Sequence, residues 1–198
     1  MIETVTGAVL AGGRSSRFGS NKAVAAWGEG TLTGTAVSCL SGIFPSVLVV
    51  GKDASVVEGL KSSVRFVSDE SKISHPLVGI LAALREAETD RVFVTACDMP
   101  LLSPFLIRTL CEAASGYPAV TAVWNDKPQP LCAIYSQECA GVIQLLLKEN
   151  RPVRHLFDIV RTRFLTSEEI GAADPSGCSF MDIDTPADYN LVLKRAHA

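Results

Sequence analysis

The sequence predicts an open α/β sheet, mostly parallel, with helices on both faces. Short β-branched runs alternate along the chain with longer amphipathic segments, an order typical of strands joined by helical crossovers. The strand-like runs are apolar without regular polar positions, as expected of central strands that are buried on both faces. The predicted strands are Thr4–Leu10, Val47–Val50, Val64–Val67, Val92–Ala96, Ala119–Val123 and Leu131–Tyr135.

Helices are predicted between and after these strands, and two of them carry clear start signals. Ser103 can cap a helix whose first turn contains Pro104. Thr185 precedes Pro186, and Asp188 follows where a capping box places an acidic residue. The predicted helices are Thr33–Leu40, Ala54–Leu60, Leu77–Ala87, Pro104–Ala114, Ala140–Glu149, Val153–Val160 and Ala187–Arg195.

One part of the sheet is expected to be antiparallel. The strands Ala119–Val123 and Leu131–Tyr135 follow each other directly, with only the polar turn WNDKPQP between them. Such a short connection suits an antiparallel pair and is too short for a parallel crossover. The chain shows no internal repeat, low-complexity tract or linker, so we expect residues 1–198 to form one domain.

Composition excludes some classes of function. The net charge of -3 argues against a protein that binds the phosphate backbone of nucleic acids. None of the six cysteines forms a C-x-x-C pair, so we expect buried thiols in a reducing compartment. The N-terminus lacks the features of a signal peptide, and no window reaches the ~18 apolar residues of a membrane span. We therefore expect a cytoplasmic protein.

A glycine-rich loop follows the first predicted strand, where α/β sheets bind their ligands. Gly12 and Gly13 let backbone amides approach a phosphate, and Arg17 and Lys22 supply positive charge. The spacing fits neither the Walker motif nor the dinucleotide fingerprint. The residues alone therefore leave two interpretations open, a polyphosphate-binding loop or a surface loop rich in glycine and serine.

The segment LAGGRSSRFGSNKA resembles the LAGGxSxRMGxxKA signature of nucleotidyltransferases, especially the molybdenum cofactor guanylyltransferase family. The resemblance implies a Rossmann-like nucleotidyltransferase sheet whose loop wraps a triphosphate. Phe18 stands where methionine is usual, and Asn21 where aspartate is common. By this resemblance the loop contacts the nucleotide through Leu10, Ala11, Gly12, Gly13 and Lys22, and Arg17 and Lys22 have catalytic roles at the phosphates.

An aspartate ends the strand in VFVTACDMP. A carboxylate at the end of a strand, opposite a phosphate loop, can hold Mg²⁺ against the oxygens of a triphosphate. Asp98 could equally begin a turn before Pro100. The string CDMPLLSP resembles the family segment whose aspartate is the metal ligand, so the resemblance makes Asp98 a catalytic, nucleotide-binding and Mg²⁺-binding residue.

Two further segments resemble parts of the nucleotide site and of the second-substrate site. Asp69 and the SHPLVGI segment resemble an acid followed by G-P-L-x-G-I, which implies nucleotide contacts by Asp69 and close backbone approach at Gly79. His75 stands where the family has glycine, and a lone histidine is more often a satisfied residue than a catalyst. The segment QPLCAIY resembles a family segment that shapes the second-substrate pocket, which implicates Gln129.

The segment FMDIDTPAD resembles the closing F-x-N-x-N-T-P-E-D of the family. Asparagines are common there in guanylyl enzymes, whereas D-x-D also occurs in cytidylyl relatives. The two-residue spacing places Asp182 and Asp184 on one face of an extended segment. They could support a metal, hydrogen-bond the pterin of a second substrate, or cap the final helix, and the sequence does not choose among these roles.

The implied reaction is guanylyl transfer from GTP to molybdopterin with Mg²⁺ as cofactor. The terminal phosphate of molybdopterin would attack the α-phosphorus of GTP and release pyrophosphate, which Lys22 and Arg17 would stabilise. Molybdoenzymes or their chaperones are further expected partners. The alternatives are a cytidylyltransferase acting on the same cofactor, which usually carries LAAG at this loop, and a non-catalytic nucleotide-binding protein. A sugar-1-phosphate nucleotidyltransferase fits less well, because it usually contains G-x-G-T-R.

Overall fold

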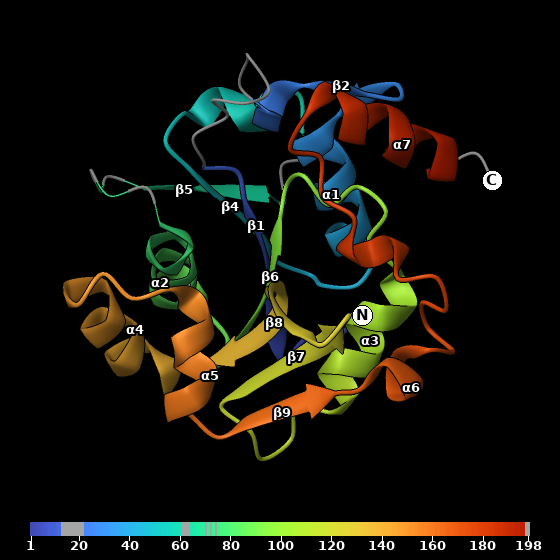
Figure 1. Ribbon diagram of the computed structural model, residues 1–198. Coiled ribbons are helices and arrows are strands. Elements are labelled where there is room, and N and C mark those ends of the chain that lie inside the picture. Colours follow the sequence, from blue (N-terminus) through green and yellow to red (C-terminus); the bar gives the residue numbers. More distant parts are fainter. Residues whose placement is uncertain (13–21, 61–63, 70, 72, 74, 197–198) are drawn as a thin grey trace.

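The computed structural model describes residues 1–12, 22–60, 64–69, 71, 73 and 75–196. Within these residues, seven strands form one open sheet in the order β5-β4-β1-β6-β8-β7-β9 (Figure 1). Two further short strands, β2 (Ala26–Trp27) and β3 (Gly30–Thr31), form a separate hairpin. The strands of the large sheet are β1 (Val5–Leu10), β4 (Val47–Gly51), β5 (Val64–Ser68), β6 (Arg91–Ala96), β7 (Ala119–Trp124), β8 (Lys127–Ser136) and β9 (Thr162–Leu165).

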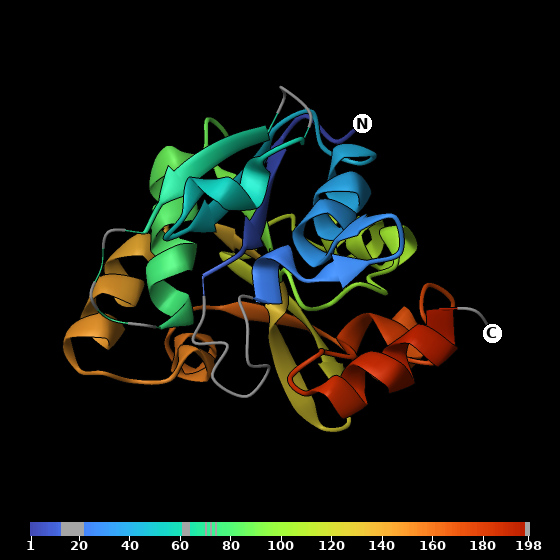
Figure 2. The same cartoon turned by 90° about the horizontal axis from the view of Figure 1, so that it is seen from above.

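Helices connect these strands and cover both faces of the sheet (Figures 1 and 2). On one face α1 and α3 pack their apolar residues against β1 and β6, together with α6. On the other face α2, α4 and α5 bury a second cluster of apolar residues. The predicted fold class is therefore confirmed. The helices are α1 (Leu32–Ser41), α2 (Pro76–Glu86), α3 (Pro104–Glu112), α4 (Cys139–Lys148), α5 (Leu156–Ile159), α6 (Ser167–Ile170) and α7 (Pro186–Ala196).

The predicted antiparallel part of the sheet is confirmed. β8 runs antiparallel to both of its neighbours, β6 and β7, whereas the other pairs are parallel. Asn125 and Asp126 form the turn before β8, both with positive φ, as a tight hairpin requires. Because this turn is short, β8 begins earlier than predicted. Pro128 and Pro130 are tolerated there, because the pairing with β6 reaches only as far as Cys132.

Two predicted helices are wrong in extent. Residues Ala54–Val57 form a 3₁₀ helix, η2, instead of the predicted α-helix to Leu60, because Gly59 adopts a φ of 75° and ends the turn. The predicted helix Val153–Val160 divides into a 3₁₀ turn, η3 (Val153–His155), followed by α5. Neither difference changes the order of the layers.

Short elements were not predicted at all. The strand β9 pairs with β7 at the edge of the sheet, and its residues Thr162 and Arg163 give it no apolar run. The helix α6 is one turn long, and its capping box is formed by Thr166 and Glu169. Such short polar segments carry too little periodicity for a prediction from sequence.

A third apolar cluster joins the β2–β3 hairpin to the end of the chain. Its buried members are Trp27 and Leu32 from the N-terminal part and Ile183 and Val192 from the C-terminal part. The Tyr189 hydroxyl on α7 donates a hydrogen bond of 3.0 Å to the Ala26 carbonyl, and its ring packs edge-on against Trp27. This cluster holds the C-terminal segment beside the residues that follow the glycine-rich loop.

The six cysteines are unpaired thiols, as the sequence predicts. Among the described residues, no helix combines the length and the apolar character that crossing a membrane requires.

Candidate active site

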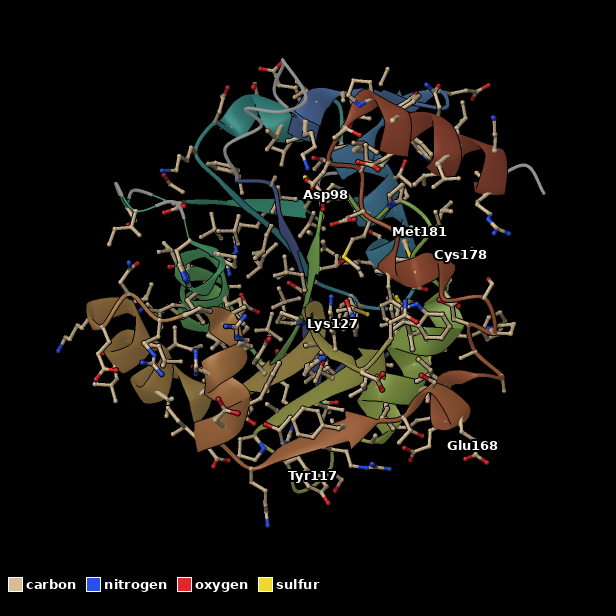
Figure 3. The ribbon with its side chains drawn as sticks, viewed as in Figure 1. Asp98, Tyr117, Lys127, Glu168, Cys178 and Met181 are labelled. Atoms are coloured by element: carbon tan, nitrogen blue, oxygen red, sulfur yellow. The ribbon has the colours of Figure 1, made fainter. Side chains whose placement is uncertain are left out.

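The exits of two neighbouring strands define the site. β1 and β6 are parallel partners, with Leu10 opposite Ala96 at their carboxyl ends. Just beyond, the Cys97 amide donates a hydrogen bond of 3.1 Å to the Leu10 carbonyl. Ala11 and Gly12, the described residues after β1, and Asp98, after β6, therefore follow neighbouring strand ends, as their positions in the sequence predict. Figure 3 shows Asp98 at the end of β6, near the segment that carries Met181.

Lys22 joins two aspartates that are far apart in sequence. Its Nζ donates to Asp98 Oδ2 at 2.8 Å and to Asp184 Oδ1 at 2.6 Å. The Lys22 and Asp98 side chains are largely buried, with 13% and 21% of their surface exposed, whereas the Asp184 side chain is 51% exposed. Burial opposes the charge on Lys22, but the hydrogen bonds to Asp184 and Asp98 outweigh it and raise the pKa of the ammonium. Lys22 is therefore a cation at neutral pH.

The C-terminal D-x-D segment is fastened directly to Asp98. The Ile183 amide donates a hydrogen bond of 3.0 Å to the Asp98 carbonyl, and the Ile183 side chain is fully buried. Partial desolvation, together with the nearby Asp184 and Asp98 carboxylates, raises the pKa of Asp182. Three carboxyl groups and one ammonium group thus share this corner of the molecule.

The cap of α7 is formed by other residues. Asp188 Oδ2 accepts hydrogen bonds from the Asp184 and Thr185 amides at 3.2 and 2.7 Å, and the Asp188 amide donates to Thr185 Oγ1 at 3.2 Å. The predicted capping box of Thr185 and Asp188 is confirmed. The side chain of Asp184 is directed instead at Lys22.

Asp69 and Gly12 face each other at the ends of β5 and β1. The Asp69 amide donates to the Gly51 carbonyl at 2.7 Å, which extends the sheet by one residue, and Oδ1 accepts from the Ser71 amide at 3.0 Å. A Cβ on Gly12 would lie 3.9 Å from Asp69 Oδ2. Asp69 also lines a cavity of about 370 Å³ between the end of β5, α2 and α4.

Gly79 acts in packing. A Cβ on Gly79 would lie 3.0 Å from the Leu10 side chain, tighter than ordinary van der Waals contact. The missing side chain therefore lets α2 approach β1 closely at Leu10, the last residue of that strand. His75 caps this helix, because its Nδ1 accepts a hydrogen bond of 3.1 Å from the Leu77 amide. Burial lowers the pKa of His75, which favours the neutral ring that a cap needs.

Backbone partners limit what some predicted residues can do. The Ala11 amide donates to the Val50 carbonyl at 2.8 Å and thus belongs to the sheet, so amides for a phosphate begin at Gly12. Gly13 and Arg17 lie outside the described residues. The Gln129 side-chain amide donates to the Lys127 carbonyl at 3.1 Å and to the Trp124 carbonyl at 3.5 Å, inside the β7–β8 hairpin.

Supporting residues in the segment before Asp182 were not predicted. Asp174 is buried and accepts hydrogen bonds from the Cys178 and Ser179 amides at 3.1 and 2.8 Å. Ser179 Oγ in turn accepts from the Ser103 amide at 2.8 Å. Asp174 opens the string Asp-Pro-Ser-Gly, a turn signal that could have drawn attention to it.

An aromatic stack also fixes this segment. The rings of Trp124 and Phe180 are stacked with centroids 5.6 Å apart, and Gly177, at a φ of 64°, lies against the Trp124 indole. The stack thus joins the end of β7 to the residues just before Asp182.

Known proteins are similar to this chain in sequence and in fold. A protein from Pelotomaculum thermopropionicum named probable molybdenum cofactor guanylyltransferase is 34% identical over 195 residues, which cover 98% of this chain and 93% of that protein. A protein of the same name from Carboxydothermus hydrogenoformans is 31% identical and is covered to 97%. The crystal structure of molybdopterin-guanine dinucleotide biosynthesis protein A from Archaeoglobus fulgidus superposes with a TM-score of 0.83 at 25% identity, over 97% of this chain and 98% of that one.

The match extends over the site as well as the sheet. The family model described as the MobA-like NTP transferase domain matches residues 7–164, which include the glycine-rich loop, Asp69 and Asp98. With the 34% identity over nearly the full chain, this match places the chain in the MobA-like NTP transferase family.

Proposed function

We propose that this chain transfers GMP from GTP to molybdopterin, forming the guanine dinucleotide form of the cofactor and releasing pyrophosphate. The observation that carries the proposal is the 2.8 Å contact between Lys22 and Asp98 beside the exit of β1. It supports the proposal because Lys22, which would bind phosphates, and Asp98, which would bind a metal, lie side by side. The names of the full-length relatives indicate the two substrates.

The proposed transfer needs groups that position the two substrates and neutralise their charge, and it needs no general base. A phosphate nucleophile is already anionic, so no side chain has to remove a proton before attack. Lys22, with Arg17, would stabilise the negative charge that gathers on the leaving pyrophosphate. The exposed backbone at Gly12 would receive the triphosphate, and Asp69 opposite Gly12 would contact the ribose or the base.

The residues present fit Mg²⁺. Asp98 offers a carboxylate oxygen, the donor type that Mg²⁺ prefers, and this ion usually completes its shell with substrate phosphates and water. The described residues contain no group of three or more acidic, histidine or cysteine side chains that could hold a metal without substrate. When bound, Mg²⁺ would neutralise the charge of the triphosphate.

Incubation with molybdopterin, molybdate and Mg²⁺, with GTP, CTP or ATP in separate reactions, tests the proposal directly. Mass analysis should find the guanine dinucleotide in the GTP reaction alone, together with pyrophosphate. The Asp98→Asn protein is the control for contaminating activity. If the dinucleotide formed only in the CTP reaction, the protein would be a cytidylyltransferase and the guanylyl proposal would be wrong. If the protein bound nucleotide but formed no dinucleotide in any reaction, it would be a non-catalytic nucleotide-binding protein.

One observation favours cytidylyl transfer as a second candidate. Asp182 and Asp184 form the D-x-D pair of the closing segment, where asparagines are common in guanylyl enzymes. The LAGG string at residues 10–13 favours guanine, and the names of the relatives agree with it. We also propose that the protein works in the cytoplasm, which six unpaired thiols suit, and that molybdoenzymes or their chaperones receive its product.

A further inference from the structure

Lys22 occupies a position that suits a metal ion. Its ammonium lies between Asp98 Oδ2 and Asp184 Oδ1, at 2.8 and 2.6 Å. Both oxygens are therefore within reach of one central atom. Oxygens of two carboxylates that converge on one cation are also the protein ligands that Mg²⁺ takes when phosphates and water supply the rest of its shell.

Asp184 is held in this position by the backbone around it. Ile183 is buried in the third apolar cluster, and its amide is bonded to the Asp98 carbonyl at 3.0 Å. The capping box of α7 is supplied by Thr185 and Asp188, and Asp188 also accepts from the Asp184 amide at 3.2 Å. The Asp184 carboxylate is thus aimed at the corner that Asp98 shares and takes no part in capping.

We propose that Asp184 is a second carboxylate for the cation that Asp98 binds, and that this cation exchanges with the Lys22 ammonium between them. The inference rests on the proposed function for the identity of the cation. An ammonium and a divalent ion would compete for the same two carboxylates, because both cannot lie between the same oxygens. Lys22 leads directly out of the glycine-rich loop, so its displaced ammonium is available to the phosphates of the nucleotide.

The affinity for the metal should therefore depend on whether the Lys22 ammonium occupies the position between the two carboxylates. Without nucleotide, Lys22 would weaken metal binding, so its removal should strengthen the affinity for metal alone. This direction is opposite to that expected if Lys22 only stabilised the local fold. The gain in metal affinity on removing Lys22 should also require Asp184, because the ammonium and the metal compete for both carboxylates.

Mn²⁺ is a suitable probe, since the free ion is measured by electron paramagnetic resonance without any turnover. We expect Asp184→Asn to weaken Mn²⁺ binding in the presence of GTP by at least the roughly tenfold loss that even supporting residues of metal sites cause. Lys22→Met should strengthen the binding of Mn²⁺ alone, and the Lys22→Met/Asp184→Asn double variant should lose this gain. The control is Glu168→Gln, which removes one carboxylate on α6, away from Asp98 (Figure 3). Its Mn²⁺ affinity should equal that of the wild type.

Two results would overturn the inference. A folded Asp184→Asn protein with wild-type Mn²⁺ affinity would make Asp184 only an anchor for Lys22. If Lys22→Met bound Mn²⁺ with the wild-type affinity, the metal ion would not exchange with the Lys22 ammonium. Asp184→Glu keeps the carboxylate and should retain more metal affinity than Asp184→Asn, which separates ligation from a general disturbance. None of these titrations uses molybdopterin, so a failure of the proposed function would be seen separately, in the dinucleotide assay.

Discussion

Lys22 Nζ and Asp98 Oδ2 lie 2.8 Å apart although 76 positions separate the two residues in sequence. The parallel pairing of β1 with β6 explains this proximity, because both residues follow the carboxyl ends of adjacent strands. Their charges therefore meet beyond the carboxyl ends of these two strands, at the site proposed for the nucleotide.

Replacing Lys22 by alanine should leave the fold intact and lower turnover by about 100-fold or more, the scale found when an electrostatic donor to a transition state is lost. Circular dichroism checks the fold, and steady-state formation of the dinucleotide measures the loss. Lys148→Ala removes an exposed lysine at the end of α4 and serves as the matched control. Normal turnover in Lys22→Ala would exclude the lysine from the reaction.

Replacing Asp98 by asparagine should shift the magnesium dependence to much higher concentration, because an amide oxygen is a weaker ligand for Mg²⁺ than a carboxylate. The measurement is a titration of initial rate against Mg²⁺ at saturating GTP. Glu112→Gln on the surface of α3 should keep the wild-type curve. Superimposable curves for Asp98→Asn and wild type would place the metal elsewhere.

Replacing Gly177 by alanine should destabilise the protein by about 2–4 kcal/mol, since the new Cβ adds left-handed strain and meets the Trp124 indole. Denaturant unfolding gives the free energy. Gly116→Ala is the control, because Gly116 also has positive φ, 77°, but nothing within 4 Å of a Cβ. Its loss should be about 1 kcal/mol. Equal losses in the two variants would contradict a role for the Trp124 contact.

His75 should make the free energy of unfolding depend on pH. Burial lowers the pKa of His75 in the folded protein below its value in the unfolded chain, about 6.5. The stabilisation is therefore complete above that value and is lost as the pH falls through the folded-state pKa. His75→Asn keeps a capping side chain without titration. Urea unfolding at pH 7.5 and 5.0 should show a smaller fall for this variant than for wild type, and equal falls would refute the assignment.

Four thiols that are buried or partly buried should react slowly with Ellman's reagent at pH 8. Burial raises the pKa of Cys39 and Cys139 to about 11 and that of Cys97 and Cys111 to about 12, so little thiolate is present. Cys178 is partly exposed and is not one of these four thiols, so Cys178→Ser should remove the fast phase in the native protein. In denaturant every thiol should react at once. Fast reaction of several thiols in the native protein would contradict this picture.

Much of the sheet was predictable, because its central strands are continuous apolar runs that end in turns. The caps at Ser103 and Thr185 were predictable for a similar reason, since a cap is a contact between residues close in sequence. The edge strand β9 and the η2 turn were not predicted correctly, because their short segments depend on the neighbours against which they pack.

The site could be predicted only in part. The position of Asp98 after a strand suggested the metal-binding role that we propose for it, but nothing local tied Asp184 to Lys22, from which it is separated by 162 positions. The Trp124–Phe180 stack was missed for the same reason, because the two rings become neighbours only in the folded chain. Asp174 accepts from amides only four and five positions later, but its turn signal did not indicate that the carboxylate is buried. Local patterns thus drew attention to the glycine-rich loop and to Asp98, whereas long-range packing decides how the closing segment meets Lys22 and Asp98.

The third apolar cluster joins the C-terminal segment to the proposed nucleotide site. A fragment that stopped after Leu165 would keep all the strands of the described sheet, yet it would lack Asp184 and the helix that packs against Trp27. Engineers who shorten this protein, or who move its termini by circular permutation, should therefore keep the segment that carries Asp184 and α7 with Lys22 and Trp27.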